Sequence, residues 1–171
     1  MKKEVYFIRH AKPDYSKIDK NGNINLPCFA PLSGEGRVNA KYLKDEINLV
    51  DKFIVVSPYT RALETAHQFI GTHPYDVNYN LHEWLPSKSF TGKVSDIAEI
   101  NKEYKKNNGN FSEKYDYETK EEMKERVQKV IDYYSNCCDK IVLVCHARII
   151  ASFLDIEEPK YCQIIKYEFE N

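Results

Sequence analysis

The chain has 171 residues and carries 25 Lys and Arg against 26 Asp and Glu, a formal net charge of −1. This length can bury one sizeable core and no Pro/Gly/Ser-rich linker divides it, so we expect a single domain over residues 1–171. The balanced charge gives no basic footprint for nucleic acid and no polybasic membrane patch, and we expect neither partner. The N-terminal apolar segment is too short for a signal peptide and the five cysteines are odd in number, so we expect a cytoplasmic protein with free thiols.

The first predicted element is a buried strand over residues 4–8, an apolar run that ends directly before an Arg-His pair. The polar stretch that follows, residues 12–32, is too long for an ordinary connection in a compact domain, which favours a functional loop. Ser33 is suited to cap a helix over residues 34–48. The face of that helix that we expect to pack on the sheet carries Gly36, Ala40, Leu43 and Ile47.

A second buried strand is predicted over residues 53–56. Ser57 has the side chain of a helix N-cap and Pro58 suits the first helical position, so we expect a helix to start there and to carry Arg61 in its first turn. The backbone N–H groups at such a helix start favour anions, and the guanidinium of Arg61 would reinforce them. A third strand is expected over residues 75–80.

The second half of the chain begins with a polar insert over residues 87–118, which we interpret as a lid or a substrate wall. A long helix is predicted over residues 118–136, because apolar residues recur there at helical spacing. These residues, which we assign to the core, are Met123, Val127, Val130, Ile131 and Tyr134. A further buried strand over residues 141–144 leads into Cys145 and His146, and alternating apolar residues predict an edge strand over residues 163–169.

Three of the predicted strands end in cationic or cation-capable side chains, at the edge where open α/β sheets bind ligands. These side chains are Arg9, His10, Arg61 and His146. Such groups cannot be crowded together without an anion to offset their repulsion, and phosphate is the obvious anion. The sequence therefore predicts a phosphate pocket that contains a nucleophile, since a neutral imidazole nitrogen is nucleophilic near pH 7.

Five motifs occur in an order that is typical of one protein family. They are Arg9-His10, Pro31-Leu32-Ser33-Gly34-Glu35-Gly36, Ser57-Pro58-Tyr59-Thr60-Arg61-Ala62-Leu63-Glu64-Thr65-Ala66, Leu81-His82-Glu83 and Val144-Cys145-His146-Ala147. Any one of them is weak, but five in order over nearly the whole chain are strong. The chain resembles the histidine phosphatase superfamily, the phosphoglycerate-mutase-like enzymes. The resemblance implies a three-layer α/β/α sandwich around a mostly parallel sheet with one antiparallel edge strand.

The resemblance also implies a metal-independent phosphomonoesterase of the histidine acid phosphatase type, which acts on a small phosphorylated metabolite or a phosphoprotein. His10 would attack phosphorus and form a phosphohistidine. Arg9 and Arg61 would bind the phosphoryl oxygens, and His146 would be a third donor that stabilises the charge developing in transfer. No cofactor and no metal are implied. The other histidines have no metal-ligand spacing and are expected on the surface or on helices: His67, His73 and His82.

Four further residues are site candidates. Glu83 is the candidate general acid, because an alcohol leaves poorly as an alkoxide, and the alternative is an ordinary surface glutamate. Ser16 lies where many family members carry an asparagine, so it is a candidate phosphate donor. Tyr15 and Trp84 are candidates to line the leaving-group side of the pocket, with ordinary packing as the alternative for both.

Two other functions stay open on the sequence. One is a phosphoglycerate mutase-type phosphotransferase, although the family's mutases resemble a longer chain with inserts that enclose the substrate. The other is a phosphate-binding module that has lost turnover through Ala11 and Ala147, where the family usually has glycine. The Cys-x5-Arg, paired Asp-x-Asp and Walker-loop patterns of other phosphate chemistries do not occur. The sequence does not predict the substrate or the oligomeric state.

Overall fold

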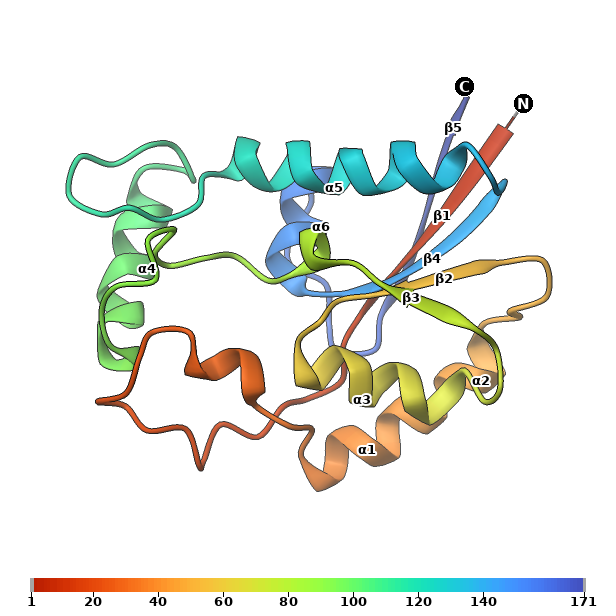
Figure 1. Ribbon diagram of the computed structural model, residues 1–171, viewed down its shortest axis with the longest axis horizontal. Helices are drawn as coiled ribbons and strands as arrows, with labels where there is room; N and C mark the ends of the chain where they lie inside the picture. The colour runs from red at the N-terminus through yellow and green to blue at the C-terminus, as the bar shows by residue number, and fades with distance from the viewer. Residues whose placement is uncertain (1, 171) are drawn as a thin grey trace.

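The computed structural model describes residues 2–170 and shows a central sheet with helices on both of its faces (Figure 1). The strands are β1 (Lys2–Arg9), β2 (Phe53–Val56), β3 (Tyr75–Val77), β4 (Lys140–Cys145) and β5 (Ile164–Glu170). Their order across the sheet is β3-β2-β4-β1-β5, and all neighbours are parallel except β5, which is antiparallel to β1. The predicted mostly parallel sheet with an antiparallel edge strand is confirmed.

Six α-helices and three short 3₁₀ turns connect these strands within the described residues. The helices are α1 (Gly34–Lys41), α2 (Leu43–Glu46), α3 (Thr60–Phe69), α4 (Ile97–Lys106), α5 (Lys120–Ser135) and α6 (Ala147–Leu154). The turns are η1 (Leu26–Phe29), η2 (Tyr79–Leu81) and η3 (Val94–Asp96). None of the helices described between residues 2 and 170 combines the length and the apolar character needed to span a membrane.

Alternating side chains of the strands enter two separate cores, as the period of two requires. In β4, Ile141 and Leu143 pack with α5 and α6 on one face, whereas Val142 and Val144 pack with α2 and α3 on the other. The helix α1 packs against α3 on that side of the sheet. The apolar residues that the sequence assigned to the core of the long helix are all buried in α5. The predicted three-layer α/β/α arrangement is therefore confirmed.

Three expected boundaries are wrong. The helix expected over residues 34–48 is divided at Tyr42 into α1 and α2, although its predicted apolar face is buried. The helix expected to start at Ser57 and Pro58 starts instead at Thr60, because Tyr59 has an extended backbone with φ −71° and ψ 136°. Arg61 nevertheless lies in its first turn. The third strand covers only residues 75–77 of the expected 75–80.

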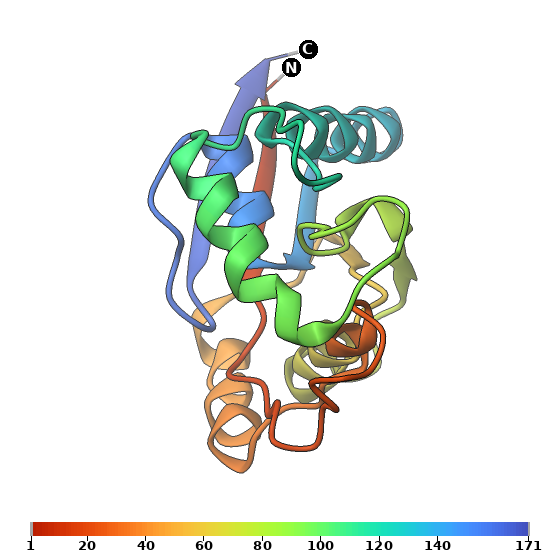
Figure 2. The same ribbon diagram turned by 90° about the vertical axis from the view of Figure 1, so that its left-hand side faces the viewer.

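The long loop and the insert come together at one end of the molecule, the end that faces the viewer in Figure 2. Asn23 and Lys93 form an isolated antiparallel bridge, and the N–H of Ile24 donates to the carbonyl of Gly92 at 3.0 Å. The insert contains η3 and α4, and α4 buries Ile100 against the core. These two segments thus form a continuous wall beside the C-terminal ends of the parallel strands.

Candidate active site

His10 follows the last residue of β1 and is held by its neighbour β4, because its N–H donates to the carbonyl of Cys145 at 2.9 Å. Its side chain is buried, with 3% of its surface exposed. Nδ1 lies 2.7 Å from the carbonyl oxygen of Ala11, and a carbonyl only accepts, so Nδ1 carries the proton. The Nε–H of Arg61 donates to Nε2 at 3.1 Å. Nε2 is therefore the unprotonated nitrogen, and its lone pair faces Arg61.

The surroundings of His10 keep its imidazole neutral. Burial is the main cause that lowers the pKa of His10 well below its usual value, and the positive charges of Arg61 and Arg9 lower it further. A neutral imidazole is the form that attacks phosphorus. The two guanidinium groups thus favour the neutral form of His10.

His146 lies at the start of α6, with its ring centroid 5.0 Å from that of His10. It is fully buried, and its Nε2 lies 2.7 Å from the hydroxyl oxygen of Ser57. Its Nδ1 is buried and has no hydrogen-bond partner among the described residues. An orphaned polar atom at this depth costs free energy that a bound ligand would recover. Burial, followed by the charge of Arg61, lowers the pKa of His146 as well.

Arg9 and Arg61 approach the two histidines from different elements. The guanidinium of Arg61 reaches across from α3, where Nη1 donates to the carbonyl of Pro27 in the long loop at 2.9 Å. Arg9 donates from Nη1 to the carbonyl of Pro159 at 2.6 Å and stacks 3.9 Å from the ring centroid of Tyr161. The Nε of Arg9 is buried without a partner among residues 2–170. Backbone carbonyls thus hold both guanidinium groups in place, and an aromatic ring also holds that of Arg9.

A cavity of about 140 Å³ adjoins Arg61, and the predicted pocket residues line it. Tyr15, Glu83 and Trp84 contribute to its walls, together with residues of the long loop and of the insert. Glu83 is partly buried, and its Oε1 accepts a hydrogen bond from the N–H of Trp84 at 2.9 Å. The carboxyl group of Glu83 and the guanidinium of Arg61 therefore line the same cavity.

Ser16 is exposed, and its N–H donates to Oδ1 of Asp14 at 2.9 Å. Its role as a phosphate donor stays a prediction. His82 is buried, 3% exposed, with its ring centroid 4.8 Å from that of Tyr79, so the expected surface or helix position is wrong. Local polarity is a poor guide to burial here because aromatic rings cover the imidazole. His67, on α3, and His73 are exposed as expected.

Sequence reasoning missed the groups that hold the Glu83 segment. Arg126 of α5 and Glu118 form a buried ion pair, with 2.5 Å between Nε and Oε1. Nη1 of Arg126 also donates to the carbonyl of Asn80, and Oε2 of Glu118 accepts from the N–H of Leu85 at 3.2 Å. The pair therefore fixes the backbone on both sides of Glu83. A charged residue among the apolar positions of α5 is the only signal that could have indicated it.

A sequence model of the family described as the histidine phosphatase superfamily (branch 1) matches residues 5–159, which is most of the chain. The chain belongs to the histidine phosphatase superfamily. The matched segment includes both histidines and both arginines of the site, and its first residues lie in β1. A search of curated proteins gave no match.

Solved structures of this superfamily's fold are similar over almost the whole chain. A mycobacterial glucosyl-3-phosphoglycerate phosphatase has a TM-score of 0.72 at 16% identity, covering 96% of this chain and 92% of its own. A phosphoserine phosphatase from Entamoeba histolytica has a TM-score of 0.67 at 21% identity, covering 95% and 89%. A structure described as mycobacterial hydrolase 1 has a TM-score of 0.72 at 16% identity, covering 98% and 92%. At these identities the similarity establishes the fold.

Proposed function

We propose that the protein is a phosphomonoesterase that works through a phosphohistidine at His10 and needs no metal ion. The observation that carries the proposal is the tautomer of His10, with Nδ1 protonated toward Ala11 and Nε2 unprotonated beside Arg61. Membership of the histidine phosphatase superfamily and the phosphatases among the similar structures support the same reaction class. Arginine forks and an imidazole donor supply the charge stabilisation that a metal ion provides in other phosphatases.

The substrate's phosphoryl group would enter between Arg9, Arg61 and His146. Its oxygens would accept from the unpartnered Nε of Arg9 and, where Nδ1 of His146 carries the proton, from that nitrogen. Arg61 now donates to Nε2 of His10, so this hydrogen bond must move to a phosphoryl oxygen before the lone pair can attack. Binding of the phosphoryl group therefore frees the Nε2 lone pair of His10 when the phosphorus atom lies beside it.

The transfer occurs in two balanced steps. In the first, the Nε2 lone pair of His10 forms the N–P bond, the ester O–P bond breaks, and the leaving oxygen takes a proton from the Glu83 carboxyl group. In the second, a water molecule gives a proton to the Glu83 carboxylate and attacks phosphorus, the N–P bond breaks, and inorganic phosphate leaves. His10 and Glu83 return to their starting protonation states.

Hydrolysis in EDTA tests the proposal with two classes of ester. We expect wild-type protein to release inorganic phosphate from para-nitrophenyl phosphate and from an alkyl phosphate such as glycerol phosphate. His10→Ala should lower kcat for both by about 10³-fold or more, because the nucleophile is lost. Glu83→Gln should lower kcat by about 10²-fold for the alkyl ester and by much less for the nitrophenyl ester, whose leaving group needs no proton.

His67→Ala is the matched control, because His67 is exposed on α3 and lies outside the site. It should leave both rates unchanged. Turnover that persists in His10→Ala, or that requires an added metal ion, would contradict the proposal. Phosphate binding that is weakened in Arg61→Ala, without any turnover in the wild type, would identify a binding module instead.

A further inference from the structure

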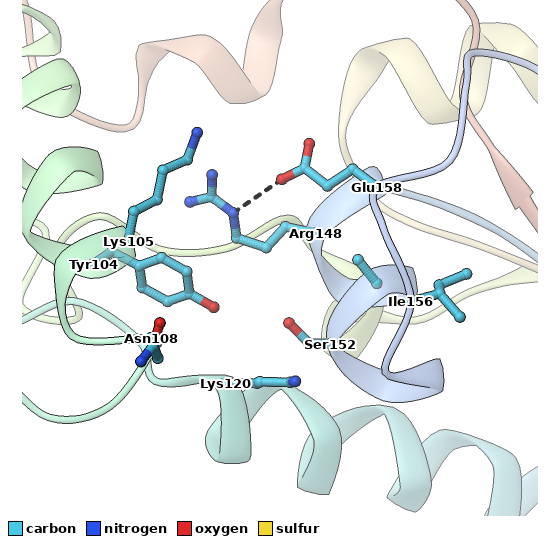
Figure 3. Close-up of a pocket in the computed structure, with 10 residues that line it drawn as sticks. Tyr104, Lys105, Asn108, Lys120, Arg148, Ser152, Ile156 and Glu158 are labelled. Carbon is cyan, nitrogen blue, oxygen red and sulfur yellow. Dashed lines mark hydrogen bonds and ion pairs between the residues drawn. The ribbon is translucent and has the colours of Figure 1, made fainter.

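A second cavity, of about 280 Å³, lies between α4, α6 and the start of α5 (Figure 3). It shares no lining residue with the cavity beside Arg61. The polar residues that line it include Tyr104, Lys105, Lys120, Arg148, Ser152 and Glu158. The mechanism proposed above uses none of these side chains.

The charges around this cavity are mostly positive. Lys105 forms no ion pair with any described residue, and Lys120 pairs with Asp155, whose side chain is 76% exposed. The carboxylate of Glu158 is 49% exposed and reaches Arg148 only at 3.4 Å, from Oε1 to Nε. Two exposed carboxylates thus face three cationic side chains, and solvent weakens the attraction of both.

Arg148 is the most constrained of the cationic groups. Its guanidinium lies between two rings, 4.3 Å from the centroid of Trp84 and 4.8 Å from that of Tyr104. Nη2 donates to Oδ1 of Asn101 at 2.8 Å, and this hydrogen bond fixes the orientation of the guanidinium plane. Nη1 is buried and has no hydrogen-bond partner among residues 2–170. A rigid, charged donor without an acceptor carries a desolvation cost that a bound anion would remove.

We propose that this cavity is a second anion site, which binds a small phosphate-bearing solute apart from the catalytic pocket. Nη1 of Arg148 donates to a phosphate oxygen, and Lys105 and Lys120 add positive charge from the two helices α4 and α5. The hydroxyls of Tyr104 on α4 and Ser152 on α6 point toward each other and are neutral donors. The volume fits inorganic phosphate or a small phosphorylated acid rather than a nucleotide-sized ligand.

Calorimetric titration with inorganic phosphate tests the proposal in a protein whose catalytic pocket has been disabled. We expect Arg61→Ala to bind one phosphate per chain. Adding Arg148→Gln should weaken this binding by about tenfold or more, because a charged hydrogen bond to the phosphate is lost. Adding Lys105→Gln should weaken it by about twofold to fivefold, since Lys105 acts through charge at the exposed side.

Lys106→Gln is the matched control for Lys105→Gln, because Lys106 is the next residue of α4, is 76% exposed and pairs with Glu103. It should not change phosphate binding. The site is refuted if Arg61→Ala binds no phosphate, if its binding survives Arg148→Gln in a protein with unchanged thermal unfolding, or if Lys105→Gln and Lys106→Gln act equally. The titration needs no turnover, so its failure leaves the assignment of His10 untouched.

Discussion

His10 and His146 are neutral imidazoles packed beside two guanidinium groups, and this combination sets how the site responds to pH. Each is buried, and for each the burial is the main cause of a lowered pKa. The arginines add to the shift in the same direction. A nucleophile held neutral in this way stays active at pH values where an exposed histidine is protonated.

The same shifts make the folded protein sensitive to acid. In the unfolded chain these histidines take up protons below about pH 6.5, whereas in the folded chain they do not, so stability is complete above that pH and is lost as the pH falls. Each buried histidine should reduce the free energy of unfolding by about 1.4 kcal/mol per pH unit below about pH 6.5. Urea unfolding at about pH 7.5 and about pH 5.5 measures this dependence.

His146→Gln should make the pH dependence shallower, while His67→Gln, at an exposed position of α3, should leave it as in the wild type. An identical slope in all three proteins would show that the buried imidazoles are not the groups that titrate.

At the scale of elements, α1 positions the backbone that follows His10. The carbonyl of Lys12 accepts from the N–H of Ser33 at 2.9 Å, and Gly36 allows this close approach because a Cβ there would lie 2.2 Å from the same oxygen. Gly36→Ala should therefore lower the free energy of unfolding by about 1–3 kcal/mol. Gly34→Ala, where an added Cβ meets no atom within 4 Å, should raise it by up to about 1 kcal/mol. Chemical denaturation distinguishes the two, and equal effects would contradict this account.

The helix α5 stabilises the Glu83 segment through the buried pair of Arg126 and Glu118. Arg126→Leu would leave the Glu118 carboxylate buried without its partner, and we expect it to cost about 3–5 kcal/mol of unfolding free energy. Lys129→Leu, at an exposed position of the same helix, should stay within about 0.5 kcal/mol of the wild type. Adding Glu118→Gln to Arg126→Leu should recover part of the loss in thermal or urea unfolding. Failure of that rescue would mean that the lost packing of Arg126 dominates.

The element boundaries show what sequence patterns could and could not predict. Apolar periodicity was sufficient for the buried strands and for the core face of α5, because burial itself sets the pattern. Capping signals failed at Ser57, a residue type suited to a helix N-cap, because its hydroxyl lies within hydrogen-bonding distance of His146, which is far along the chain. Apolar periodicity missed the pair of Arg126 and Glu118, since a long-range ion pair leaves no local spacing to recognise.

At the scale of the whole molecule, the strand order brings the site together. Because β4 lies between β1 and β2 and is parallel to both, the ends of all three strands meet at one edge. His10, Arg61 and His146 could be expected to converge for this reason alone. The orientation of Arg9 could not be predicted, because it depends on Pro159 and Tyr161 in the loop before β5.

The cavity beside Arg61 and the second cavity are linked by residues that contact Arg148. Trp84 lines the cavity beside Arg61, and its ring also carries the guanidinium of Arg148. Glu158, which contacts Arg148, directly precedes Pro159, whose carbonyl holds Arg9. The proposed catalytic pocket and the proposed second anion site therefore share supporting residues. Different side chains would donate to the anion in each.

The central claim is that a phosphoryl group resides on Nε2 of His10 during turnover. Rapid quenching under alkaline conditions with a radiolabelled phosphate ester, followed by peptide mapping, tests it most directly. We expect acid-labile label on the peptide that contains His10 in the wild type and none in His10→Ala. With an ester whose leaving group needs no proton, Glu83→Gln should carry more label than the wild type. Turnover by a wild-type protein that never carries label on that peptide, or label that persists in His10→Ala, would contradict the account.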